Sequence, residues 1–221
     1  MIDFYYLPAS APCRAVMMLA KAIGVRLNLK IVDILKREQL KFSFIKINPQ
    51  HSIPTLNDNG FILWESRAIM IYLVSRYAKN DDLYPKNPRR KSIVDQRLYF
   101  DIGTLYKNVY NTYFDVMLGN IKQPLEKEVQ DLEKSLEILN IFLQDTKFVA
   151  GNCLTIADFS IVATISTAEA FGFDIARYDN VAAWYKRCRN SMAKFDFEEI
   201  NITGAKILGN MYKKNLKLET G

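Results

Sequence analysis

A short sequence, Ser10-Ala11-Pro12-Cys13, lies where an apolar strand signal at residues 2–7 gives way to a helix signal. Proline near the first turn is typical of a helix start, so we expect a helix from about Pro12. The N-terminus of a helix presents unpaired N–H groups and partial positive charge. A serine at this point can cap the helix, or its hydroxyl can donate a hydrogen bond to a bound anion.

The same four residues have the spacing of a C-x-x-C redox motif whose first cysteine has been replaced. Dithiol exchange needs two sulfurs, so the replacement argues against thioredoxin-like reduction. We expect Cys13, one turn into the helix, to be packed rather than reactive, and a monothiol role is the lesser alternative.

The chain has a single histidine, His51, and three scattered cysteines. These numbers exclude a histidine-rich zinc site and argue against a Cys₃His site, so no metal is expected. A Ser-His-acid triad would have to use His51, and no GxSxG elbow accompanies it. His51 is therefore a candidate for binding a ligand, although a lone histidine is more often structural.

The composition of the 221 residues is ordinary for a globular protein, with 49% apolar and 24% charged residues. The odd, sparse cysteines indicate reduced thiols. No apolar run approaches the roughly 18 residues of a membrane span. The first ten residues lack the basic flank and long apolar centre of a signal peptide. We therefore expect a cytoplasmic protein with no membrane partner.

Positive charge is concentrated in residues 1–80, where Lys and Arg outnumber Asp and Glu by eleven to five. The remaining residues are balanced, so this part accounts for the net charge of +6. Such asymmetry indicates either an anionic partner or a general solubility charge. Because no Lys/Arg block with interleaved aromatic residues occurs, a small acidic ligand fits better than nucleic acid.

Strand and helix signals alternate through the first part of the chain. Leu27, Leu29 and Ile31 alternate with polar residues, as in a strand. A helix is expected at about 37–47, ending before Asn48-Pro49. Asn59-Gly60 then joins two short strands as a hairpin, and a helix starts at Ser66. The expected order is β-α-β-α-β-β-α.

After Pro85 and Pro88 the strand signals stop. Apolar residues at three- and four-residue steps predict an amphipathic helix through Val129, Leu132, Leu136, Leu139 and Leu143. Further along, Thr155 and Asp158 have the spacing of a capping box, which predicts a buried helix reaching about Phe171. We therefore expect a first domain over residues 1–78, a linker over 79–87 and an all-helical domain over 88–221.

Several segments, in this order, resemble the cytosolic glutathione transferases, most closely the insect delta class. The resemblance covers nearly the whole chain, and the segments that carry it are YYLPASAPCRAV at 5–16, NPQHSIPTL at 48–56, WESRAIMIYL at 64–73, QRLYFDIGTLY at 96–106, VAGNCLTIADFS at 149–160 and VAAWYKRC at 181–188. It implies an α+β/all-α two-domain fold, in which a thioredoxin-like βαβαββα domain precedes an all-helical domain. It also implies a homodimer that conjugates glutathione to small apolar electrophiles in xenobiotic detoxification.

The resemblance assigns a role to each residue of a glutathione site, with glutathione as co-substrate. Ser10 would stabilise the glutathione thiolate. The tripeptide would be held through its two carboxylates, its ammonium group and its central amide. The expected binding residues are Gln39, His51, Ile53, Pro54, Glu65, Ser66, Arg67 and, across a two-fold interface, Asp101 of the partner. The family holds the Ile53-Pro54 bond cis, which sequence alone does not establish.

Two positions depart from the commonest family pattern. Gln39 stands where many relatives carry a histidine at the glycyl end of glutathione, and Ala9 replaces a glycine before the serine. Gln still donates hydrogen bonds but carries no charge, and alanine restricts the backbone more than glycine does. We expect weaker glutathione affinity with activity retained.

An aromatic stripe in the second domain is the candidate wall for the electrophile. Its members are spaced for one helical face, and they are Tyr106, Tyr110, Tyr113, Phe114 and Met117. The alternative is an ordinary core stripe. Leu7, Pro8 and Leu35 would close the other side.

Two questions stay open at this stage. The segment after about Gly204 is rich in lysine (Lys206, Lys213, Lys214, Lys217) and can be a frayed tail or a lid. A protein that carries glutathione or apolar ligands with feeble turnover is the rival function. The physiological electrophile is not indicated.

Overall fold

The first strand is buried on one face and is an interior strand of a small mixed sheet. The computed structural model describes residues 1–217, and in it Ile2, Phe4 and Tyr6 point into the core while the residues between them are partly exposed. The strand order is β2-β1-β3-β4, with β1 and β2 parallel and the other pairs antiparallel. The strands are β1 (Ile2–Tyr6), β2 (Leu27–Ile31), β3 (Thr55–Asp58) and β4 (Phe61–Trp64).

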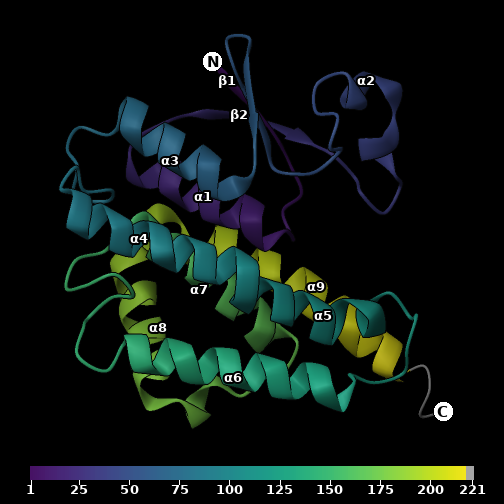
Figure 1. Cartoon of the computed structure of the whole chain (residues 1–221). Coiled ribbons are helices and arrows are strands. Elements are labelled where there is room, and N and C mark those ends of the chain that lie inside the picture. Colours follow the sequence, from purple (N-terminus) through teal and green to yellow (C-terminus); the bar gives the residue numbers. More distant parts are fainter. Residues whose placement is uncertain (218–221) are drawn as a thin grey trace.

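Two helices cover the face of the sheet that is turned toward the rest of the chain (Figure 1). They are α1 (Ala11–Ala22) and α3 (Ser66–Tyr77), and they pack against each other. The β3–β4 turn consists of Asn59 and Gly60, both with positive φ, which confirms the predicted two-residue hairpin. The βαβαββα order and the thioredoxin-like first part are confirmed.

The single helix expected at about 37–47 is wrong. The segment forms a 3₁₀ turn over Glu38–Leu40 and a one-turn helix α2 (Phe42–Ile45), separated by Lys41 in an extended conformation. Before them, the side chain of Asp33 accepts hydrogen bonds from the N–H groups of Leu35 and Lys36. Such local side-chain bonding competes with a continuous helix.

The second part of the chain is helical, as predicted. Its helices are α4 (Pro88–Phe100), α5 (Tyr106–Met117), α6 (Glu126–Phe142), α7 (Ile156–Ala170), α8 (Asp179–Met192) and α9 (Thr203–Lys217). A π-helical turn over Asp101–Leu105 joins α4 to α5, and a second one over Phe197–Ile202 precedes α9. Every residue of α7 from Ile156 to Ala168 is buried, because α1, α4, α5 and α9 all pack around this helix.

The lysine-rich C-terminal segment is an ordered helix as far as Lys217, so the frayed-tail alternative is wrong for the described residues. Helix α9 packs on α5 and α7, with Leu208 and Tyr212 buried. The Nδ2 group of Asn215 donates to the carbonyl oxygen of Met117 over 2.5 Å. The last four residues of the expected 88–221 domain lie outside the described residues.

The predicted capping box at the start of α7 is present. The Thr155 backbone N–H donates to the Asp158 carboxylate over 2.9 Å, and the Thr155 side chain lies at the N–H of Asp158. Asp158 also accepts hydrogen bonds from the indole of Trp184 and the N–H of Val149. Helix α7 is therefore fixed at its first turn from both sides.

We expect Thr155→Ala to lower the free energy of unfolding by about 1 kcal/mol, because the substitution removes the cap from a buried helix. Chemical denaturation of the variant and the parent protein measures this difference. The matched control is Ser43→Ala at an exposed position of α2, where we expect no change. Equal stability of the Thr155 variant and the control would contradict the prediction.

Candidate functional site

Ser10 lies in the turn that carries the chain from β1 into α1. Its N–H donates to the carbonyl oxygen of Leu7 over 3.0 Å, and its own carbonyl accepts from the N–H of Arg14 over 3.0 Å. The backbone of Ser10 is extended, yet its side chain makes no capping hydrogen bond to the helix. The half-buried hydroxyl therefore stands at the positive end of α1 without serving as its cap.

The Cys13 thiol lies one turn further along and is completely buried. Burial raises its pKa to about 11, and this effect outweighs the lowering by the neighbouring Ser10 hydroxyl. The thiol is therefore protonated at neutral pH, and thiolate is the nucleophilic form. The expectation that Cys13 is packed is confirmed, and the monothiol alternative has no support from its surroundings.

A loop before β3 contributes the second side of the site. The buried Asn48 side chain holds this loop by donating to the Ser52 carbonyl oxygen over 3.0 Å and to the Thr55 hydroxyl over 2.9 Å. His51 is exposed with φ of 44°, and the Ile53–Pro54 bond is cis, as the resemblance implied. The loop thus presents an exposed imidazole close in sequence to the half-buried Ile53 backbone.

The start of α3 contributes the third side. Glu65 precedes the helix with φ of 67° and is exposed, while Ser66 is the first helical residue and only 2% exposed. The Glu65 carboxylate accepts from the Nε2 group of Gln50 over 3.4 Å, and Gln50 in turn accepts from the indole of Trp64 over 2.7 Å. A helix N-terminus beside an exposed carboxylate can bind both charged groups of an amino acid.

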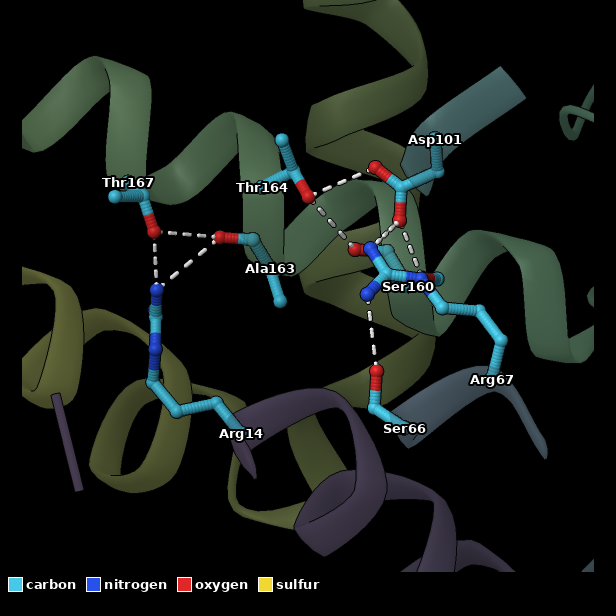
Figure 2. A network of polar contacts seen from close by, with 8 residues as sticks. All are labelled: Arg14, Ser66, Arg67, Asp101, Ser160, Ala163, Thr164 and Thr167. Carbon is cyan, nitrogen blue, oxygen red and sulfur yellow. Dashed lines mark hydrogen bonds and ion pairs between the residues drawn. The ribbon is translucent and has the colours of Figure 1, made fainter. Parts of the chain in front are cut away.

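Arg67 and Asp101 join the two parts of the chain in a buried ion pair, shown on the right of Figure 2. The Arg67 guanidinium donates to Asp101 and, over 3.0 Å, to the Ser66 hydroxyl. Asp101 also accepts from the Ser160 hydroxyl and, over 2.9 Å, from the Thr164 hydroxyl, both on α7. The positive charge of Arg67 is thus already paired before any ligand binds.

Asp101 is completely buried and faces α7 of its own chain. The arrangement expected from the resemblance, in which Asp101 reaches across a two-fold axis, is therefore not the one present. The reason is the π-helical turn over Asp101–Leu105, which joins α4 to α5 and lies against α7.

A second buried arginine, on the left of Figure 2, was not singled out from the sequence. Arg14 is completely buried and donates to Thr167, to the Ala163 carbonyl oxygen over 3.2 Å and to the Asn201 side chain over 2.7 Å. Burial lowers its pKa to about 10, so it is charged at neutral pH. These bonds fix the helix that carries Ser10 onto α7.

The aromatic stripe of α5 is divided between the surface and the core. Tyr110 is exposed and stacks on the half-buried Phe114 with ring centroids 4.3 Å apart. The half-buried Tyr106 ring lies 5.4 Å from the Arg67 guanidinium carbon, which places this end of α5 at the first-domain site.

Tyr113 and Met117, by contrast, are buried. The Tyr113 ring packs on Phe171 and Tyr212 with centroids 4.9 and 5.5 Å apart. For these two residues the burial and the aromatic packing favour the core alternative over a place in the electrophile wall. Leu7 and Pro8 are half-buried and Leu35 is exposed, so all three keep accessible surface.

Within residues 1–217, no group of three or more His, Cys, Asp or Glu side chains lies close enough together to hold a metal ion. Among the helices of this same range, none combines the length and the apolar character that a membrane span requires.

The chain thus belongs to the class of two-domain proteins in which a thioredoxin-like domain, here with a serine at the N-terminus of α1, precedes an all-helical domain. The chain matches the family model "Glutathione S-transferase, N-terminal domain" over residues 3–75 and "Glutathione S-transferase, C-terminal domain" over residues 104–191. The chain therefore belongs to the glutathione S-transferase family.

Individual relatives support the delta-class resemblance. The chain is 46% identical to glutathione S-transferase D7 of Anopheles gambiae over 214 residues, which is 96% of this chain and 97% of the relative. A delta-class glutathione transferase of Nilaparvata lugens superposes with a TM-score of 0.93 at 48% identity, covering 97% of this chain and 100% of that one. A Bombyx mori glutathione transferase gives a TM-score of 0.93 at 45% identity, covering 95% and 97%.

Proposed function

We propose that this protein is a glutathione transferase in which Ser10 stabilises the glutathione thiolate for attack on apolar electrophiles. The observation that carries the proposal is the Ser10 hydroxyl, which stands at the N-terminus of α1 without capping it. A free cysteine thiol has a pKa of about 8.5, so only a few per cent is ionised at neutral pH. A donor preorganised toward the sulfur favours the anion.

The chemistry needs neither a metal nor a covalent enzyme intermediate. The glutathione thiol gives its proton to solvent, and the thiolate forms a bond to the electrophilic carbon while the leaving group departs with its electron pair. The protein contributes the hydrogen bond from Ser10, the positive end of α1 and the positioning of both reactants.

Each polar group of glutathione has a proposed partner in the site. The N-terminus of α3 at Ser66 would bind the γ-glutamyl carboxylate, and Glu65 would bind its ammonium group. The backbone at Ile53, before Pro54, would pair with the central amide. The glycyl carboxylate would meet His51 and Gln39. Because Asp101 pairs with Arg67, we assign Arg67 to positioning Ser66 rather than to a free cationic contact.

The electrophile would lie against the accessible aromatic residues Tyr106, Tyr110 and Phe114, with Leu7 and Leu35 opposite. An apolar wall of this kind suits broad selectivity for small apolar xenobiotics. A conjugation assay with a chlorinated nitrobenzene tests the proposal against the carrier alternative. Turnover supports the enzyme, whereas glutathione binding without turnover supports the carrier.

We expect Gln39→His to lower the KM for glutathione several-fold with little change in kcat, because a partly protonated imidazole attracts the glycyl carboxylate more strongly than a neutral amide does. Initial rates at varied glutathione concentration measure the effect. The expectation for Gln39 is contradicted if the parent protein already has the KM for glutathione of relatives with an imidazole here, and if Gln39→His does not change that KM. The φ of Ala9 lies outside the left-handed region, so alanine causes no backbone strain at this position.

We further propose a cytoplasmic homodimer with the domain division at residues 79–87. Exposed apolar side chains lie at the end of α4 and in the π-helical turn that follows it, where Tyr99 is 75% and Ile102 is 37% exposed. They border a cavity of about 240 Å³ that also includes Arg67 and Ile71. A self-complementary contact through this surface fits a two-fold dimer. Sedimentation of Tyr99→Glu against the parent protein tests it, since loss of the dimer is expected.

A further inference from the structure

A second hollow lies toward the C-terminal end of α1, away from Ser10 at its N-terminal end, where the helix meets the edge strand β2. It has a volume of about 480 Å³, which falls within the range of small-molecule sites. Its walls are apolar and come from three separate segments of the chain, through Met17, Val25, Leu27, Leu29 and Ile200.

The hollow exists because the residues at its base are small. Ala20 is 2% exposed, and Gly24 ends the α1 region with φ of 74° and has no heavy atom within 4 Å of the position that a Cβ would take. Leu29 in its wall is 44% exposed, which leaves a large apolar side chain in water when the hollow is empty.

Two cations border this apolar surface. Lys21 forms an ion pair with Asp196 over 2.7 Å, and Glu199 lies on the same side. Arg26 is exposed and has no hydrogen-bond or ion-pair partner among residues 1–217. No carboxylate belongs to the lining itself. The hollow therefore combines an apolar floor with one available guanidinium at its rim.

We propose that this hollow binds amphiphilic carboxylates, with the hydrocarbon chain along Val25, Leu27 and Leu29 and the carboxylate on Arg26. A guanidinium pairs with a carboxylate through two parallel N–H donors. The carboxylate headgroup is therefore held at the Arg26 end of the site. Methylene groups contribute affinity as they leave water, so affinity increases roughly fourfold for each one that is buried. The site is separate from the proposed conjugation site and needs no turnover.

Isothermal titration with octanoate, decanoate and dodecanoate, below the concentrations at which they form micelles, tests the proposal. S-hexylglutathione is present at saturation to block the conjugation site. We expect affinity to rise with chain length and dodecyltrimethylammonium, a cation with the same tail, to bind at least tenfold more weakly. If S-hexylglutathione itself does not bind, the proposed function fails, while the carboxylate titrations still test this site.

Matched variants on β2 and at the residue just before it locate the site. Arg26→Gln is expected to weaken dodecanoate binding about tenfold, because a hydrogen bond to a charged group is lost. Leu29→Gln is expected to weaken it several-fold. The controls are Lys30→Gln and Ile31→Gln, which are exposed on β2 outside the lining and should bind dodecanoate as the parent protein does.

Three outcomes overturn the proposal. The first is no binding of any carboxylate while S-hexylglutathione is present. The second is equal weakening in the test variants and their controls. The third is equal binding of the cationic amphiphile. The first outcome has one specific explanation. If the protein self-associates through the unpaired edge of β2 and Leu29→Gln abolishes this association, a strand and not an amphiphile occupies this surface.

Discussion

Replacing Ser10 with alanine is expected to lower kcat for conjugation by about 100- to 1,000-fold, the range seen when one preorganised donor to a developing or bound anion is removed. The KM for glutathione should change little, because the tripeptide is held mainly by groups at the loop before β3 and at the start of α3. Steady-state kinetics at neutral pH, with both substrates varied, measures the two effects separately.

The fold should not suffer from this substitution, because the Ser10 side chain makes no capping hydrogen bond whose loss would destabilise α1. The control is Cys153→Ser, which removes an exposed thiol away from the site and should keep full activity. A nearly unchanged kcat in the Ser10 variant would show that a group other than Ser10 stabilises the thiolate.

Replacing Asp101 with alanine is expected to lower the free energy of unfolding by about 3–5 kcal/mol, because it leaves the largely buried guanidinium of Arg67 without its counter-ion. For a chain of this length, the loss corresponds to a fall in melting temperature of roughly 6–20 °C. Thermal unfolding followed by circular dichroism measures it. Asp145→Ala, at an exposed position outside the site, is the matched control and should melt as the parent protein does.

A double variant separates the cost of an unpaired charge from the value of the pair. Asp101→Leu combined with Arg67→Met removes both charges and is expected to recover a substantial part of the stability. If the double variant is less stable than Asp101→Ala, then the buried pair itself stabilises the contact between α3, the π-helical turn and α7. Glutathione binding should weaken in both variants, because Arg67 no longer positions Ser66.

Features set by neighbouring residues were predicted well from the sequence. The Asn59-Gly60 turn and the Thr155–Asp158 capping box depend on groups only one to three residues apart, and both are present. The failure at residues 37–47 has the same local origin, because the Asp33 side chain binds the backbone just before this segment and the extended Lys41 divides the helix expected there.

Features that depend on distant residues were not predicted. Asp101 lies 59 residues from Ser160 and 63 from Thr164, and neither hydroxyl carries a sequence signal that points to a carboxylate. For Arg14 the sequence does offer one signal. It is the only charged residue in the apolar stretch 11–20 of α1, which indicates burial. Spacing alone also could not divide the α5 stripe, since a row at helical spacing is wide enough for Tyr110 to face solvent while Tyr113 packs in the core.

The most direct measurement is a titration of the glutathione thiol in the complex, followed by the ultraviolet absorbance of the thiolate. The proposed mechanism predicts that binding lowers the pKa of this thiol by about two units from its value in water, which corresponds to roughly 2.7 kcal/mol in favour of the anion. In Ser10→Ala most of that shift should disappear. A bound thiol that ionises at the same pH as free glutathione would contradict the mechanism.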